Sequence, residues 1–287
     1  MYESIESLSS TYSVSTICSA LDVNRSSYLY WLNHRKKSLE LKAVFYQEII
    51  RIYADSGGIY GAPKIWFLLN KNGFSCSVST VYRAMVVLGI RSIVSKRFPK
   101  RQSKLSDNER ALIVNRTKDL FVNRINQVWT TDITYIHTIY EGTFYLITFI
   151  DLFSKKVVAW GLFKDQKADK IVAVLDKAVK SRKPGPGLIC HSDKGSQLRS
   201  KLYRDYLKKH NFVFSYTSLH HSCDENPAQE SFHSLIKKEF LYQQKIYTFE
   251  DAYRVIFDYI EGFYNPIRIH SSLGYLSPND FENQLSM

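Results

Sequence analysis

The sequence predicts an α/β protein in which a mixed sheet with flanking helices follows an all-helical region. Three observations support this fold class. Apolar residues recur at helical spacing before residue 90. From Val128 onward, β-branched and aromatic runs are typical of strands. Strands then alternate with helices in the order βββαβαβα, which favours a sheet covered by helices.

The predicted helical region, residues 1–90, begins with a pair of helices around a tight turn. A first helix is indicated by the spacing of Val14, Ile17, Cys18 and Leu21, and Asp22-Val23-Asn24 forms the turn. A second short helix follows from Ser26 to Leu32, and its inward residues are expected to be Tyr28, Leu29 and Leu32. This pattern predicts a helix-turn-helix, with an ordinary helical hairpin as the alternative.

A second pair of helices is predicted between residues 59 and 90. Pro63 suits the first turn of a helix, Asn72-Gly73 breaks it, and Ser77 or Ser79 caps the next helix, which ends at Gly89. Two such units in tandem favour DNA binding. We expect Arg25 and Arg83 to contact DNA, and a solvated face is the alternative for the helix that carries Arg83.

The charge distribution also indicates a polyanionic partner. The chain carries 39 Lys and Arg against 27 Asp and Glu, a net charge of +12. Residues 1–107 hold 15 of these basic residues and 7 acidic ones, so the front of the chain has most of the excess. Residues 91–108 are predicted to be a basic linker that follows a phosphate backbone. Its expected DNA contacts are Lys96, Arg97, Lys100 and Arg101, and a solvated, mobile segment is the alternative.

Residues 109–287 are predicted to form the sheet domain with a C-terminal helical extension. The first two strands read W-T-T-D-I-T-Y-I-H-T and T-F-Y-L-I-T-F-I-D, and Glu141-Gly142 joins them. K-K-V-V-A-W-G-L completes an antiparallel meander. Further strands are expected at 188–191 and 212–216, and helices at 167–181, 198–210, 230–241 and 249–264.

Three acidic residues stand at positions that suit a divalent-cation site. Asp132 falls within the first strand, Asp193 just after the fourth, and Glu230 in the first turn of the helix after the fifth. In this topology the first and fourth strands are neighbours, so the three carboxylates can converge. Unpaired carboxylates repel one another, and hard cations such as Mg²⁺ remove that conflict. The structural alternatives are a backbone cap for Asp132 and a favourable helix-dipole position for Glu230.

Two such ions, about 3.5–4 Å apart, activate the attacking and leaving oxygens of a phosphodiester. The pattern therefore predicts in-line attack on DNA without a covalent protein intermediate. Lys237, two helical turns after Glu230, is expected to contact the phosphate backbone, as are Lys194 and Gln197 after Asp193. A solvated surface is the alternative for Lys237, and Glu225 is the alternative to Glu230 as the third acid.

Other polar residues indicate structural roles. Asp151 is expected in a turn. His191 and His233 are expected either in the core or packed beside the site, because paired zinc-ligand spacing is absent. The four scattered cysteines predict reduced thiols in a cytosolic protein. The longest apolar-rich run, Phe144 to Ile150, is too short to span a bilayer.

Five motifs together resemble one protein family. They are G-G-I-Y-G-A-P-K-I at 57–65, W-T-T-D-I-T-Y at 129–135, H-S-D-K-G-S-Q at 191–197, E-N-P-A-Q-E-S-F at 225–232 and Y-N-P-I-R-I-H-S-S-L-G-Y-L-S-P at 264–278. In this order the chain resembles the catalytic, second-frame transposases of two-frame bacterial insertion sequences, which have a retroviral-integrase-like DDE core. The 36 residues from Lys194 to Gln229 exceed the usual family spacing by one.

The resemblance implies a ribonuclease-H-like core in which Asp132, Asp193 and Glu230 hold two Mg²⁺ or Mn²⁺ ions. It also implies a helical region that recognises terminal inverted repeats, a target DNA, and a homodimer or higher multimer on DNA. The expected activity is metal-dependent strand cleavage and strand transfer in the bacterial cytoplasm, at the nucleoid. The alternatives are a structure-specific nuclease on the same core and a non-catalytic DNA-binding regulator.

Overall fold

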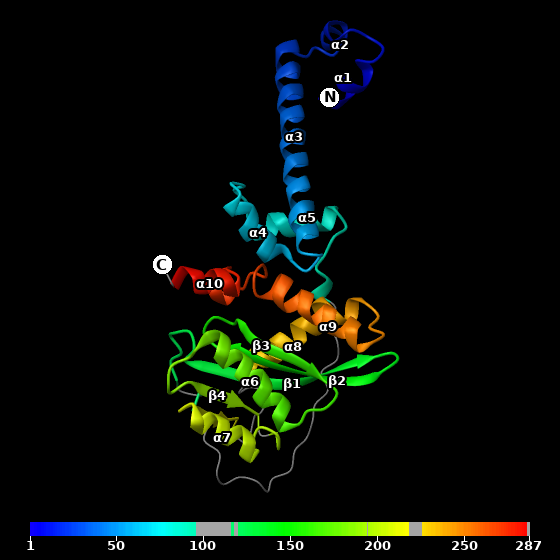
Figure 1. Cartoon of the computed structure of the whole chain (residues 1–287). Coiled ribbons are helices and arrows are strands. Elements are labelled where there is room, and N and C mark those ends of the chain that lie inside the picture. Colours follow the sequence, from blue (N-terminus) through cyan, green and yellow to red (C-terminus); the bar gives the residue numbers. More distant parts are fainter. Residues whose placement is uncertain (96–115, 118–119, 194, 218–225, 286–287) are drawn as a thin grey trace, which may run out of the picture. The chain divides into compact units, whose positions relative to one another are not determined.

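A computed structural model describes residues 1–95, 116–117, 120–193, 195–217 and 226–285 (Figure 1). Lys96, Arg97, Lys100, Arg101, Lys194 and Glu225, for which the sequence predicted contacts or ligand roles, lie outside these residues. The chain divides into two compact units, Met1–Ser92 and Ile93–Met287. Each unit is described by itself below.

The first unit opens with three helices, α1 (Tyr2–Leu8), α2 (Val14–Ala20) and α3 (Arg25–Asp55). They enclose a small core of Ile5, Ile17, Cys18 and Tyr28. The side chain of Asn24 caps α3 by accepting hydrogen bonds from the backbone N–H groups of Ser26 and Ser27, at 2.8 and 3.2 Å. The predicted sequence of helix, turn and helix is confirmed for α2 and the start of α3.

The prediction that the second helix is short was wrong. Helix α3 continues for 31 residues, because the segment after Leu32 contains no glycine or proline and many residues of high helix propensity. Leu29 was also wrongly expected to face inward, and it is 38% exposed. Successive helical residues are turned by about 100°, so Leu29 points away from the core that Tyr28 enters.

The predicted second pair of helices is present as α4 (Ala62–Lys71) and α5 (Val78–Val87), and both helices pack against α3. Pro63 lies in the first turn of α4, and Gly73 after it has a φ of +90°, which favours glycine. Ser77, rather than Ser79, caps α5 by accepting from the Thr80 N–H. Arg83 is exposed on α5, as predicted.

The second unit contains the predicted five-stranded mixed sheet, with strand order β3-β2-β1-β4-β5. Strands β1, β2 and β3 are antiparallel, and β1 pairs in parallel with β4, which pairs in parallel with β5. This is the expected ribonuclease-H-like arrangement. The elements are β1 (Val128–Thr138), β2 (Gly142–Asp151), β3 (Val157–Phe163), α6 (Ala168–Arg182), β4 (Ile189–Ser192), α7 (Lys201–Lys209), β5 (Val213–Tyr216) and α8 (Pro227–Glu239). Helix α7 begins three residues later than predicted, and α8 begins three residues earlier.

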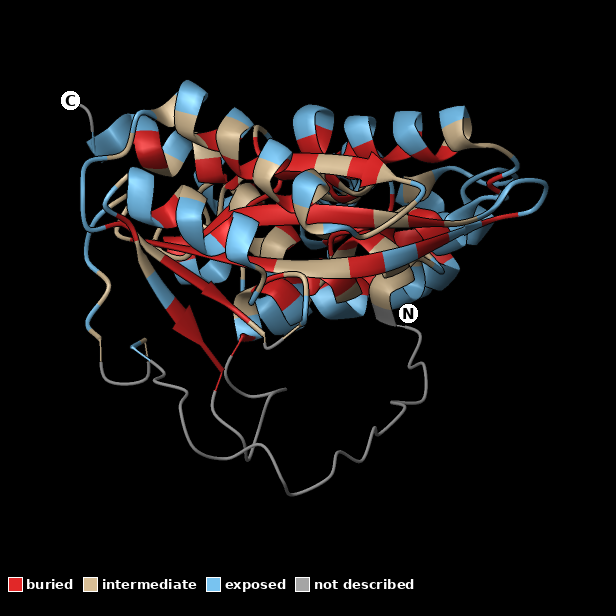
Figure 2. Cartoon of the chain, turned by 60° about the horizontal axis from the view of Figure 1, so that its bottom comes forward, coloured by how far each residue is buried: buried red, intermediate tan, exposed pale blue. Residues whose placement is uncertain are grey.

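The two faces of the sheet carry different residues and different helices. Ile147 and Phe149 of β2 enter the apolar core shared with α6 and α7. Thr148, between them, instead bonds to Gln229 of α8. Successive strand residues point to opposite faces, so α8 covers the face opposite α6 and α7. Figure 2 shows that buried residues concentrate in the strands and on the helix surfaces turned toward them.

Helix α9 (Phe249–Phe257) continues as a π-helical segment, Asp258–Tyr264, so the predicted helix from 249 to 264 is confirmed in extent. The chain then folds through a 3-10 turn (Ser271–Leu273) into α10 (Pro278–Leu285). None of the helices in the described part of the chain combines the length and the apolar character that a bilayer span requires.

Buried ion pairs attach this C-terminal segment to the sheet domain. The Arg268 guanidinium donates to both carboxylate oxygens of Glu239, from Nη2 to Oε1 at 2.7 Å and from Nε to Oε2 at 2.9 Å. Tyr259 Oη also donates to Glu239, at 2.8 Å. Arg182 likewise donates to both carboxylate oxygens of Glu282 on α10, at 2.8 and 2.9 Å. These contacts fix the end of α8 and the position of α10.

Asp151 occupies the predicted turn position at the end of β2. Its side chain is fully buried and accepts hydrogen bonds from the backbone N–H groups of Asn126, Phe153 and Ser154, at 2.6, 2.9 and 3.2 Å. Because those bonds use its oxygens within the turn, Asp151 serves the local structure.

We predict that Arg268→Met lowers the free energy of unfolding by ~3–5 kcal/mol, because Glu239 then remains buried without its partner. The double variant Glu239→Leu/Arg268→Met should recover most of that loss. Urea denaturation of the full chain measures both. Arg254→Met is the matched control, because Arg254 pairs with Asp251 at the surface and its side chain is 71% exposed. This substitution should lower the free energy of unfolding by at most about 1 kcal/mol.

Candidate active site

The parallel pairing of β1 with β4 brings two of the three predicted acids together. Thr131 of β1 pairs with Ser192 of β4. Asp132 and Asp193 are the next residues after this pair, so they lie close together. Burial of the Asp193 carboxyl raises its pKa, and the nearby charge of Asp132 raises that pKa further. The backbone N–H of Gly195, which donates to Asp193 Oδ1 at 3.0 Å, opposes this rise.

Helix α8 presents two basic side chains to Asp132. His233 Nδ1 lies 3.5 Å from Asp132 Oδ2. Lys237, one turn further along the helix, is half-buried, and burial lowers its pKa while the charge of Asp132 opposes that shift. Lys237 is therefore electrostatically coupled to Asp132. The other oxygen of Asp132, Oδ1, accepts from the Ile133 N–H at 2.8 Å.

Glu230 lies in the first turn of α8, as predicted, and its residue is exposed. Within the described ranges, no three His, Cys, Asp or Glu side chains form a ready-made metal site. The fold thus brings two carboxylates together and carries the third on the helix that packs against β1.

Gln229, next to Glu230, is the residue that the sequence analysis missed. It is fully buried, and its Nε2 donates to the carbonyl oxygens of Thr130 at 2.7 Å and Thr148 at 3.3 Å. Thr148 Oγ1 donates to Gln229 Oε1 at 2.8 Å. Two sequence features indicated it: a polar residue within the apolar run of β2, and an amide directly before a candidate acid.

The remaining predicted residues have varied surroundings. Gln197 lies on the loop between Asp193 and α7, where its Oε1 accepts from Ser196 Oγ at 3.3 Å. Arg25 is exposed at the start of α3. His191 is buried, with Nδ1 3.0 Å from Ser215 Oγ, so it packs within the sheet as expected.

The donor set of this site fits a hard divalent cation. Asp132 and Asp193 supply carboxylate oxygens from adjacent strands, which are the ligands that Mg²⁺ and Mn²⁺ prefer. Among the described residues, no Lys, Arg or His forms a salt bridge with Asp193. Burial therefore works against the ionised form of its carboxyl. A cation between the two carboxylates would remove their repulsion.

Three family models match separate parts of the chain. An integrase core domain matches residues 122–222, a second integrase core model matches residues 230–285, and an HTH-like domain matches residues 40–98. Residues 1–39, with α1, α2 and the start of α3, lie outside these three ranges.

Curated relatives match almost the whole chain. The sequence is 32% identical, over 99% of this chain and 98% of the relative, to transposase InsF for insertion sequence IS3A of Escherichia coli (strain K12). It is also 32% identical, over 87% of this chain and 98% of the relative, to the transposase for insertion sequence element IS904 of Lactococcus lactis subsp. lactis (strain IL1403).

Among solved structures, the chain is similar to the HTLV-2 integrase catalytic core domain in complex with magnesium, with a TM-score of 0.40 and 14% identity. That match covers 54% of this chain and 94% of the integrase chain. The catalytic domain of Mos1 mariner transposase gives a TM-score of 0.42 and 15% identity, over 48% of this chain and 71% of that chain.

We predict that Asp193→Asn raises the free energy of unfolding at pH 7 in buffer without divalent cations. The folded-state pKa of Asp193 lies above its ordinary value of 3.8, so the ionised carboxylate destabilises the fold at neutral pH. As the pH falls through that raised pKa, the wild-type residue takes up a proton, and the difference between the proteins should shrink until it vanishes below 3.8.

Denaturation of both proteins as a function of pH measures this difference. The exposed Asp205→Asn, on α7, is the control and should change stability little at any of these pH values. A constant difference between Asp193→Asn and the wild type from pH 7 to pH 3 would contradict the assigned cause.

Proposed function

The chain belongs to the family of IS3-type insertion-sequence transposases, and from this premise we propose that Asp132, Asp193 and Glu230 form its catalytic triad. As a DDE transposase it is a polynucleotidyl transferase, which joins and breaks DNA phosphodiesters. The observation that carries the assignment of the triad is the position of Asp132 on β1 and of Asp193 directly after β4, its parallel neighbour, beside the helix that bears Glu230.

We propose that these carboxylates hold two Mg²⁺ or Mn²⁺ ions. Bound there, divalent cations supply the positive charge that activates a water or 3′-hydroxyl nucleophile and stabilises the transferring phosphoryl group. The protein's own contribution is to hold the carboxylates in place: His233 contacts Asp132 from α8, and Gly195 donates to Asp193.

Lys237 is proposed to contact a DNA phosphate next to the triad. Burial lowers the pKa of Lys237, so the charged form of this lysine is energetically costly. The charge of Asp132 offsets part of that cost, and a phosphate would offset more. Lys194 and Gln197, which follow Asp193 in the sequence, are proposed to contact the same DNA.

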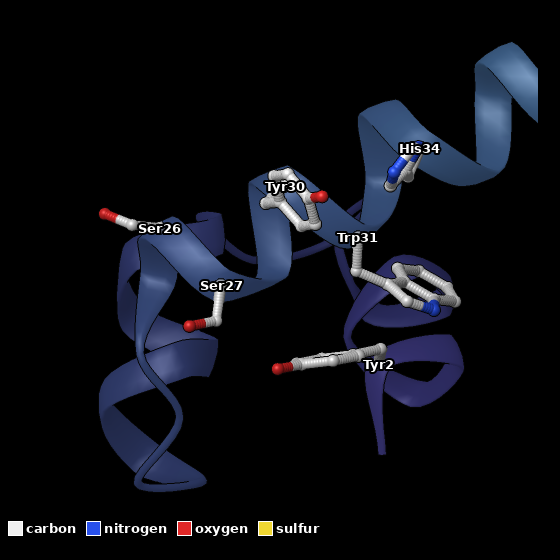
Figure 3. Close-up of a pocket in the computed structure, with 6 residues that line it drawn as sticks. All are labelled: Tyr2, Ser26, Ser27, Tyr30, Trp31 and His34. Carbon is white, nitrogen blue, oxygen red and sulfur yellow. The ribbon is translucent and has the colours of Figure 1, made fainter.

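The first unit is proposed to read the terminal repeats. The start of α3 borders a pocket of about 640 Å³ lined by Tyr2, Ser26, Ser27, Tyr30, Trp31 and His34 (Figure 3). These side chains offer hydroxyl, imidazole and aromatic groups without any acid. The first turns of the second helix of a helix-turn-helix contact base edges, so this surface is the proposed reading face, with Arg25 and, on α5, Arg83 contacting phosphates.

The remaining assignments follow from the same premise. Residues 1–90 are proposed to bind DNA ends, residues 91–108 to connect the domains along the backbone through Lys96, Arg97, Lys100 and Arg101, and residues 109–287 to carry out catalysis. Joining two element ends requires two active sites in one complex, so we propose a homodimer or higher multimer that acts on DNA in the bacterial nucleoid.

We predict that Asp132→Asn abolishes cleavage and strand transfer in Mg²⁺ and leaves the affinity for terminal-repeat duplexes within about 3-fold of the wild type. The substitution removes one carboxylate charge and keeps the side-chain shape. Cleavage assays on a labelled end duplex and gel-shift titrations measure the two effects, with Asp205→Asn as the control. Equal loss of binding and catalysis would argue against a catalytic role for Asp132.

A strand-transfer assay with a pre-cut end oligonucleotide tests the assignment of the reaction. The transposase should join the 3′-hydroxyl of that oligonucleotide to a target duplex. A protein that cuts DNA without joining it is the structure-specific nuclease, and one that binds without cutting or joining is the regulator.

We predict that Tyr30→Ala/His34→Ala weakens binding to the terminal repeat by about 10-fold or more relative to a scrambled duplex, since lost base contacts typically cost ~1–3 kcal/mol. The ring centroids of Tyr30 and His34 lie 5.0 Å apart, and both side chains are exposed. Tyr12→Ala, at a tyrosine 59% exposed between α1 and α2, is the control. An unchanged ratio between the two duplexes would exclude this face from sequence recognition.

A further inference from the structure

Gln229 makes a set of hydrogen bonds that joins α8 to two strands at once. Its amide donates to carbonyl oxygens of β1 and β2, at Thr130 and Thr148, and accepts from the Thr148 hydroxyl. The residue is fully buried. Burying an amide is costly unless its donors and acceptor are satisfied, as they are here. Such a group specifies one arrangement of its neighbours more than it adds stability.

These bonds lie at the same level of the sheet as Asp132. Thr148 is the cross-strand partner of Asp132. His233, one helical turn after Gln229, approaches both: its Nε2 lies 3.5 Å from Thr148 Oγ1, and its Nδ1 lies 3.5 Å from Asp132 Oδ2. The face of α8 turned toward the sheet is therefore aligned with the first carboxylate of the triad.

We propose that Gln229 is a positioning residue that sets the rotation and register of α8, so that Glu230 is presented to Asp132. This inference rests on the proposed catalytic role of Glu230. A shift of α8 by one residue turns each side chain by about 100° and moves it by about 1.5 Å along the axis. An apolar residue at position 229 would tolerate such shifts, whereas an amide bonded to two carbonyls holds one position.

The opposite end of α8 is fixed independently. Glu239, its last residue, is bonded to Arg268 and Tyr259. This contact holds the C-terminal end of the helix, nine residues beyond Glu230, and leaves the rotation of the first turn to Gln229. Removal of the Gln229 amide should therefore change the presentation of Glu230 while the helix stays in place.

The test is Gln229→Met, which keeps the volume and removes the amide. Mn²⁺ titration of the DNA-free protein, followed by electron paramagnetic resonance of free Mn²⁺, should show an affinity about 10–100-fold weaker, the usual effect of losing a partner that orients a ligand. The midpoint of thermal unfolding without metal should change by less than about 3 °C, because an apolar group replaces the whole buried amide and the Thr148 hydroxyl keeps His233 Nε2 at 3.5 Å as a partner. With DNA saturating, the strand-transfer rate should fall while the Kd for DNA is retained.

Two further variants keep the inference falsifiable. Ser231→Ala, at the exposed neighbour of Glu230, should bind Mn²⁺ like the wild type. Thr148→Val removes the hydroxyl that bonds to Gln229 and should weaken Mn²⁺ binding in the same direction, which provides a second measurement if Gln229→Met does not fold. Wild-type Mn²⁺ affinity in either Gln229→Met or Thr148→Val would overturn the positioning role.

The failure of this inference can be told apart from failure of the proposed function. If Asp132→Asn retains both Mn²⁺ affinity and strand transfer, the triad itself is wrong. If Asp132→Asn loses both while Gln229→Met keeps wild-type values, the triad stands and Gln229 does not position it.

Discussion

The parallel pairing of β1 with β4 is the contact on which the candidate site depends. A parallel pair requires a crossover, which here is β2, β3 and α6, so the two strands come from distant parts of the chain. Because β4 ends beside the middle of β1, Asp132 within β1 and Asp193 just after β4 meet there. The apolar core beneath β1, β2 and α6 keeps this edge rigid.

The two faces of the sheet make different kinds of contact with the helices that cover them. Toward α6 and α7 the contacts are apolar and close-packed, which stabilises the domain. Toward α8 the contacts include buried hydrogen bonds of Gln229 and Thr148 and the bidentate pair of Glu239 and Arg268. Directional bonds accept few geometries, so the helix that carries Glu230 is held where alignment matters.

The charges at the site are balanced only in part by the protein. Burial works against the ionised forms of both Asp193 and Lys237, and their groups are coupled to Asp132. A site assembled in this way is suited to components that bring their own charge: divalent cations on the carboxylate side and phosphates on the lysine side. Charges that are only partly neutralised in this way are typical of functional sites. In a structural ion pair such as Arg182 with Glu282, by contrast, the guanidinium neutralises the carboxylate and bonds to both of its oxygens.

The sequence by itself determined the order of the elements, the helix start at Pro63, the turn at Asp151, and the placement of Asp132, Asp193 and Glu230 on their elements. Local propensity and the alternation of apolar residues are sufficient for these features. Only the tertiary structure decided the bonds of Gln229, His233 and Arg268. These depend on contacts between residues far apart in the chain, and such contacts leave no periodic pattern around any one of them.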